Sequence, residues 1–189
     1  PPIRNHAERE TADTKFAGGY VKEVDPGLYE WVVSFDLNSL YPNIIAQWNM
    51  SPETLVESGN NVSRAANGVL FDNSFEGVFP TLVKNYYEER RVVKKQMLAA
   101  QSKYQKEKTR ELEREIATYQ NKQWAIKILM NSLFGAIGNK WYRYFDLRIA
   151  EGITLTGQHV IKWCEKTINN ELNRLLETDT DYVIAIDTD

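Results

Sequence analysis

Residues 31–43 read WVVSFDLNSLYPN, and this stretch carries the strongest single indication of the fold. An apolar run rich in β-branched and aromatic residues is typical of a buried strand, so we expect a strand over residues 30–37. Asp36 lies at its end, just before a tight segment that includes Pro42. A carboxylate at the end of a buried strand is costly unless it is compensated, usually by a divalent cation in such a site. Asp36 is therefore a candidate metal ligand, unless it only caps a turn.

A second acidic strand is expected at the other end of the chain, where residues 183–189 read VIAIDTD. Asp187 and Asp189 are two residues apart, so their side chains share one face of an extended chain. Two strands that each bring an acid to the same sheet edge predict a two-metal site. Mg²⁺ suits such a site because it binds few carboxylates together with phosphates and water. The alternative is that both acids belong to a loop.

The longest helical pattern runs from Pro80 to about Asn131, because this stretch contains no glycine and no further proline. It is too long for one ordinary helix, so we expect two antiparallel helices that join around residues 103–109. Residues 84–127 contain 12 Lys or Arg and 6 Asp or Glu, whereas the whole chain has a net charge of -3. A basic segment beside an acidic remainder indicates a polyanion site next to a cation site. A solvated helix face of mixed charge is the alternative.

The other expected elements complete an α+β fold. We expect a further strand over residues 20–24 and an irregular surface excursion over residues 51–79, which are rich in Asn, Ser and Gly. A helix is expected over residues 147–176, followed by the final strand. Five residues of that helix are spaced to form one buried face, namely Ile149, Ile153, Thr156, Val160 and Trp163.

Composition indicates an ordinary globular protein, with 42% hydrophobic and 26% charged residues. The one cysteine, Cys164, excludes a disulfide framework within the chain. No apolar run approaches the ~20 residues of a membrane span, and the first residues do not resemble a signal peptide. We therefore expect no membrane partner and a cytoplasmic location, in the host cell if the protein is viral.

Four polar residues are spaced to form a phosphate-binding cluster on the helical hairpin. Arg90 and Lys94 are four residues apart on the first helix, and Lys127 and Asn131 are four apart on the second. In a folded-back hairpin these pairs can face one another and hold a triphosphate, Arg through its planar fork and Lys as a point charge. Each residue taken singly is more often a solvated side chain.

These segments resemble the sequence motifs of family B DNA polymerases. DLNSLYPN at residues 36–43 resembles motif A (DxxSLYPS), and KILMNSLFG at residues 127–135 resembles motif B (KxxxNSxYG). IDTD at residues 186–189 resembles motif C (YGDTDS), and FAGG at residues 16–19 resembles the YxGG element before motif A. YEERRVVKKQM at residues 87–97 resembles the triphosphate-binding fingers segment. All occur in the family's order, and the similarity is greatest to the T4-like phage branch.

The resemblance implies a DNA-directed DNA polymerase, a nucleotidyltransferase of DNA replication that adds dNTPs to a primer 3'-hydroxyl with two Mg²⁺ ions. The implied fold is an incomplete palm, an antiparallel sheet with packed helices, into which an antiparallel helical-hairpin fingers subdomain is inserted. Residues 1–79 would be a connector and the first palm part, residues 80–137 the fingers, and residues 138–189 the second palm part. The implied partners are primer-template DNA, dNTP, exonuclease and thumb domains, and a sliding clamp.

The same resemblance implies three groups of site residues. The metal ligands would be Asp36, the carbonyl of Leu37 and Asp189, with Asp187 as the accompanying catalytic acid. The nucleotide would contact the backbone amides of Ser39, Leu40 and Tyr41 and the side chains of Arg90, Lys94, Lys127 and Asn131. The base pair and template would contact Phe134, Gly135, Gly18 and Gly19. Tyr41 would also lie beneath the sugar and exclude a 2'-hydroxyl.

Several positions depart from the family pattern without removing a metal or phosphate ligand. Phe134 and Phe16 replace tyrosines, Asn43 replaces a serine, and residues 185–186 replace Tyr-Gly. The Phe134 replacement removes a hydroxyl that would reach the minor groove. A rival interpretation is a non-catalytic nucleic-acid-binding or structural arm, but residues 84–131 lack the sustained heptads that a coiled coil needs.

The chain ends on the second acid of motif C, and we expect it to be a fragment. An extein boundary or a split gene is one origin for that end, and an arbitrary boundary is the other. On either origin, we expect a piece that binds nucleotide or DNA but lacks polymerase activity until a C-terminal part completes it.

Overall fold

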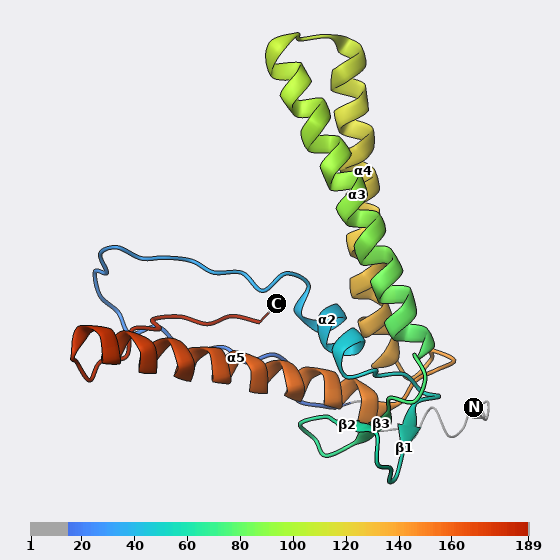
Figure 1. Cartoon of the computed structure of the whole chain (residues 1–189), viewed down its shortest axis with the longest axis vertical. Helices are drawn as coiled ribbons and strands as arrows, with labels where there is room; N and C mark the ends of the chain where they lie inside the picture. Colours follow the sequence, from blue (N-terminus) through green and yellow to red (C-terminus); the bar gives the residue numbers. More distant parts are fainter. Residues whose placement is uncertain (1–14, 189) are drawn as a thin grey trace.

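The computed structural model describes residues 15–188, which form a mixed α+β structure with four helices and a small antiparallel sheet. In chain order the elements are α2 (Leu40–Gln47), β1 (Leu55–Val56), β2 (Val62–Arg64), β3 (Leu70–Asp72), α3 (Val78–Lys106), α4 (Arg110–Ile137) and α5 (Leu147–Leu176). The helices α3 and α4 form a long hairpin that projects from the remainder, and α5 runs away from its base in another direction (Figure 1). Among the described residues, no helix is both long and apolar enough to cross a membrane.

The helical hairpin expected from the sequence is present, and its turn lies at the expected place. The helix α3 ends at Lys106 and α4 begins at Arg110, within the predicted bend at residues 103–109. Thr109 is the N-cap of α4, because its side chain accepts a hydrogen bond from the backbone N–H of Leu112 at 3.3 Å. Acidic residues in the first turn of α4 and basic residues in the last turn of α3 complement the helix dipoles.

The hydrophobic core lies at the base of the hairpin, where α2, the sheet and the first turns of α3 and α5 meet. Its buried members are Ile44, Ile45, Met50, Ala65, Phe71, Phe79, Val83, Ile137, Ile149, Ala150 and Ile153. The predicted buried face of α5 is confirmed for Ile149, Ile153 and Thr156. It is wrong for Trp163, which is 62% exposed. Val160 is half-buried, because the fully buried part of the helix ends at Gly157.

Residues 51–79, predicted to be irregular, contain a three-stranded antiparallel sheet in the order β1-β3-β2. Phe71 on the central strand pairs with Leu55 on one side and Ser63 on the other, and it is fully buried. Asn49 fastens the loop that follows β3, because its side-chain Nδ2 donates to the carbonyls of Asp72 and Phe75. The prediction failed because strands of two or three residues are too short to show an alternating pattern.

The predicted strand over residues 30–37 is wrong for this structure. Residues 32–37 form no strand, and Trp31 and Phe35 are 97% and 82% exposed. The predicted strands over residues 20–24 and 183–186 reduce to one bridge between Lys22 and Ile186. A strand is stable only when a neighbour satisfies its backbone groups, and no strand within residues 15–188 pairs with residues 30–37.

Candidate functional site

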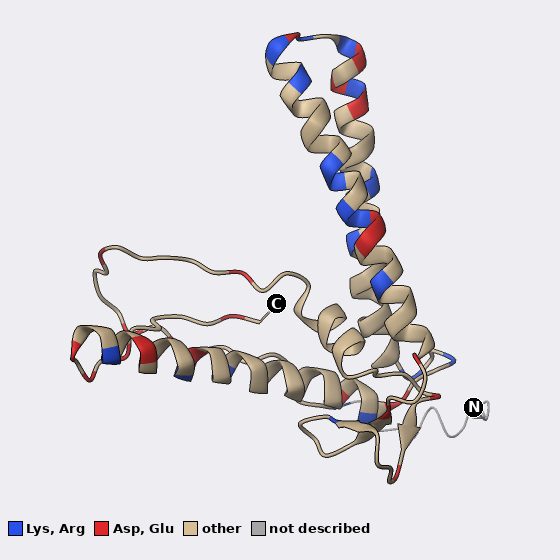
Figure 2. Cartoon of the chain, viewed as in Figure 1, with Lys and Arg blue, Asp and Glu red and all other residues tan. Residues whose placement is uncertain are grey.

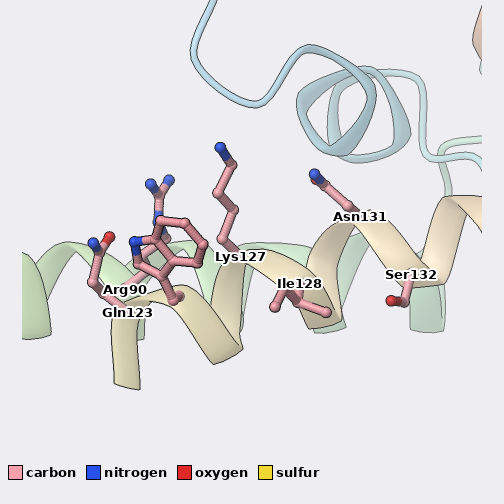
Figure 3. A pocket seen from close by; sticks show the side chains of 7 residues that line it. Arg90, Gln123, Lys127, Ile128, Asn131 and Ser132 are labelled. Carbon is pink, nitrogen blue, oxygen red and sulfur yellow. The ribbon is translucent and has the colours of Figure 1, made fainter. Parts of the chain in front are cut away.

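A cavity of about 500 Å³ lies on the lower half of the α3–α4 hairpin. Its lining residues are Arg90, Gln123, Trp124, Lys127, Ile128, Asn131 and Ser132. Gln123, Lys127 and Asn131 are four residues apart, so they follow one another along a single face of α4. The side chains of Arg90, Lys127 and Asn131 project to the same side of the hairpin (Figure 3). The cavity therefore gathers three of the four residues predicted to bind phosphate.

The cavity is electropositive and contains an unsatisfied donor. Within residues 15–188, Arg90 Nε is buried and has no hydrogen-bond partner, a situation that costs about 1–3 kcal/mol unless a ligand or water supplies an acceptor. No carboxylate of the described residues forms an ion pair with Arg90, Lys94 or Lys127. Lys and Arg positions, drawn in blue, are frequent along the ribbon of the hairpin (Figure 2). The arrangement can accept a polyanion without first breaking an ion pair.

Lys94, the fourth predicted phosphate ligand, is exposed on α3 and does not line the cavity. Gln123 and Trp124 line it but were not predicted. The four-residue spacing from Gln123 to Lys127 repeats the spacing from Lys127 to Asn131 and would have identified Gln123. Trp124 is 60% exposed, and the sequence holds no signal that separates it from a solvated aromatic residue.

Within residues 15–188, the first backbone amides of α2 have no side-chain cap. Ser39, the residue before the helix, has φ 51° and ψ 55° and provides no side-chain cap. The side chain of Asn43 donates to the carbonyls of Asn38 at 2.7 Å and Ser39 at 3.2 Å, which supports this left-handed turn. The first amides of a helix have no partner within the helix, so they attract anions. Asn43, a departure from the family pattern, thus has a local structural role.

Tyr41 and Phe134 stack on each other, with ring centroids 4.7 Å apart and an interplanar angle of 27°. Gly157 of α5 lies close to the edge of the Tyr41 ring, because a Cβ at this glycine would lie 3.0 Å from Tyr41 Cε1. Tyr41 is therefore held where α2, α4 and α5 meet. Gly135, also predicted to contact a base pair, has open space in the direction of a Cβ, with no atom within 4 Å.

The predicted metal-binding acids are only partly described by the structure. Asp36, Leu37 and Asp187 are exposed, and Asp189 lies outside the described residues. Residues 15–188 contain no group of three or more His, Cys, Asp or Glu side chains close enough to hold a metal ion. The donor set of two carboxylates and a backbone carbonyl has the hard oxygen atoms that Mg²⁺ prefers, so its chemistry fits. The pairing of Asp36 with Asp189 stays a prediction.

The glycines predicted to lie near the template have different surroundings. A Cβ at Gly18 would meet no atom of the described residues within 4 Å, and the carbonyl of Gly18 accepts a hydrogen bond from Gln158 Nε2 of α5 at 2.7 Å. Gly19 lies directly against Thr188, and a Cβ there would overlap the backbone oxygen and side chain of that threonine. Residues 18–22 are thus packed beside the segment that contains Asp187.

Comparison with known proteins gives a consistent set of similarities. The family model described as DNA polymerase family B matches residues 3–188. The chain is 32% identical to the DNA-directed DNA polymerase of Escherichia phage RB69, over 92% of this chain and 26% of that protein. It is 35% identical to a DNA polymerase of Pyrococcus glycovorans, over 97% of this chain and 23% of that protein. For a DNA polymerase of Thermococcus gorgonarius the identity is 37%, over 94% and 22%. The chain therefore spans about a quarter of the length of these relatives.

Proposed function

The chain belongs to DNA polymerase family B, and from this membership we propose that it forms the nucleotide-binding part of a DNA-directed DNA polymerase. The observation that carries the proposal is the cavity on the hairpin, where Arg90, Lys127 and Asn131 converge and neither basic residue has an ion-pair partner among residues 15–188. In this proposal residues 80–137 are the fingers, and residues 1–79 and 138–189 belong to the palm. The reaction is attack of a primer 3'-hydroxyl on the α-phosphate of a dNTP, with release of pyrophosphate.

The basic residues of the cavity hold the triphosphate. The guanidinium of Arg90 offers a planar pair of donors to phosphate oxygens, and its buried Nε gains the acceptor that it lacks. Lys127 contributes a point charge, and Asn131 a neutral donor on the same helix face. Lys94 lies one turn beyond Arg90 on α3 and neutralises the phosphates from the solvent side. The amides at the start of α2, from Ser39 to Tyr41, bind the phosphate tail.

Tyr41 selects the sugar, and its neighbours keep it in place. The ring stacks on Phe134 and lies close to the backbone of Gly157, so it cannot easily move away from a 2'-hydroxyl. Phe134 and Gly135 lie against the new base pair, and the open space beside Gly135 leaves room for it. Gly18 and Gly19 lie toward the template strand.

The acids provide the charge for two Mg²⁺ ions, which would be held by Asp36, the Leu37 carbonyl and Asp189, with Asp187 beside them. When bound, these ions lower the pKa of the 3'-hydroxyl and neutralise the leaving phosphates. The contribution of the chain itself is to position the nucleotide and the acids and to supply positive charge to the phosphates. Because the relatives are about four times longer, we propose that the chain works together with exonuclease and thumb domains on primer-template DNA.

The proposal is tested with the full-length gene product on a primed template with Mg²⁺ and dNTPs. Replacing Lys127 by Ala preserves the helix but removes a charge that acts on the reacting phosphates, so the rate of nucleotide addition should fall by about 100-fold. Affinity for DNA should stay within about twofold, because Lys127 faces the nucleotide. Single-turnover extension and DNA titration give the two quantities.

Lys122→Ala is the matched control, because Lys122 is an exposed lysine on the same helix that pairs with Glu89 at 3.0 Å. Its loss should leave the rate of nucleotide addition nearly unchanged, since surface ion pairs contribute only about 0–1 kcal/mol. Absence of templated extension by the unmodified protein would refute the proposed function. A Lys127→Ala variant that is impaired only in DNA affinity would instead assign this lysine to the template.

A further inference from the structure

Residues 18–22 lie beside residues 186–188, and the contact is close along its whole length. The backbone N–H of Lys22 donates to the carbonyl of Ile186 at 2.9 Å, and Thr188 Oγ1 donates to the carbonyl of Tyr20 at 2.9 Å. Gly19 leaves no space for a side chain against Thr188. Asp187 lies between these two attachment points, so its position depends on where residues 18–22 lie.

The side chain of Lys22 connects this pair of segments to the rest of the molecule. Its ammonium donates to Glu165 Oε1 of α5 at 2.6 Å and to Asp181 Oδ2 at 2.5 Å. The Lys22 and Glu165 side chains are both only 19% exposed. Burial alone would lower the pKa of Lys22, but the hydrogen bonds to Asp181 and Glu165 outweigh it and raise the pKa, so the ammonium stays charged.

Other contacts lead to the same helix. Gln158 of α5 donates to the carbonyl of Gly18, and the ammonium of Lys162 lies 4.6 Å from the centre of the Tyr20 ring. Asn169 of α5 binds the returning segment, because its Nδ2 donates to Asp181 at 2.8 Å and its Oδ1 accepts from the Tyr182 N–H at 2.8 Å. The first turns of α5 are buried in the core, so this helix is a fixed support.

Residues 183–188 have little other support. Within the described residues they form one isolated bridge and no strand, so the contacts above hold them in place. We propose that Lys22 is a positioning residue for Asp187, because its backbone holds Ile186 while its ammonium joins Glu165 of α5 to Asp181. The metal-binding role of Asp187 rests on the proposed function, whereas the positioning of the segment does not.

Hydrogen exchange tests the positioning directly in the 189-residue chain. In Lys22→Met, amides of residues 181–188 should exchange about 10-fold faster, the effect expected from losing charge-assisted hydrogen bonds. Amides of α3 and α4 should be unchanged. Lys22→Arg should restore slow exchange, and Glu165→Gln should give an intermediate rate. Lys84→Met is the control, because Lys84 forms a similarly short ion pair with Glu76 far from Asp187.

Electron paramagnetic resonance measures how tightly the full-length gene product binds Mn²⁺. This affinity tests whether the position of Asp187 depends on Lys22. Lys22→Met should weaken Mn²⁺ binding by about 10-fold, with recovery in Lys22→Arg and no change in Lys84→Met. Unchanged exchange in Lys22→Met overturns the positioning, and faster exchange with unchanged Mn²⁺ affinity overturns the link to Asp187. An unmodified protein that neither binds Mn²⁺ nor extends a primer overturns the proposed function, while the exchange result still decides the positioning.

Discussion

The helical hairpin is stabilised differently from the two segments that contain the predicted metal-binding acids, residues 32–37 and 183–188. Each helix of the hairpin satisfies its own backbone, and the pair buries Val93, Met97, Ile126 and Met130. Residues 32–37 and 183–188, by contrast, depend on chain that is distant in sequence, and they form no strand within the described part of the molecule. The cavity on the hairpin is therefore built by two helices that each satisfy their own backbone, whereas the arrangement of the acids is set by contacts with chain that is distant in sequence.

The largest effect is expected for a variant of Asp36, which tests whether this exposed acid acts in catalysis and not in folding. Asp36→Asn in the full-length gene product should reduce the rate of nucleotide addition by about 1000-fold or more, because a metal ligand supplies several kcal/mol of transition-state stabilisation. Circular dichroism of the helices should be unchanged, since Asp36 is exposed. Asp179→Asn, which removes another exposed acid, is the control and should extend primers normally. Normal extension by Asp36→Asn would remove Asp36 from the site.

A pair of core and surface truncations tests the difference in stability itself. Met130→Ala should lower the free energy of unfolding of the 189-residue chain by about 3 kcal/mol, because Met130 is fully buried in the hairpin. Val33→Ala should change it by less than about 0.5 kcal/mol, because Val33 is 70% exposed. Urea denaturation measures both values. An equal loss in the two variants would show that residues 32–37 are packed, and the contrast between the regions would fail.

Tyr41 lies where the two regions meet and should affect specificity more than rate. Tyr41→Ala in the full-length gene product should raise incorporation of ribonucleotides relative to deoxyribonucleotides by about 30-fold, a change of about 2 kcal/mol in discrimination. Tyr87→Ala, which removes an exposed tyrosine of α3, should not alter this ratio. Competitive single-nucleotide extension gives the ratio directly. Unchanged sugar discrimination would remove Tyr41 from this role.

The smallest expected effect concerns the tip of the hairpin. Thr109→Ala should destabilise the 189-residue chain by about 1 kcal/mol, because it removes the N-cap of α4. Thr118→Ala is the matched control within the same helix, where Ala is the better helix former and stability should not fall. Thermal unfolding followed by circular dichroism compares the two. A Thr109→Ala variant as stable as the control would show that the tip contributes nothing to the hairpin.

The sequence predicted most reliably what is decided within one or two helical turns. The bounds of α5 follow from the spacing of its apolar residues, and the hairpin of α3 and α4 follows from a long stretch without helix-breaking residues. The contacts of Lys22 with Glu165 and Asp181 span 143 and 159 residues, and no local pattern encodes them. The strand prediction for residues 30–37 failed for the same reason, because hydrophobicity indicates a preference for burial but does not supply a partner.

The length of the hairpin also makes it a lever. A helix of 28 residues, such as α4, is about 42 Å long at ~1.5 Å per residue. Its base is packed into the core through Ile137, and the rings of Tyr41 and Phe134 stack there. A rotation of about 10° there would move the tip by about 7 Å but the cavity near Lys127 by only about 2–3 Å, given the same rise per residue. Small adjustments around a bound nucleotide would therefore be magnified at the far end of the arm, where a distance-sensitive label would report them.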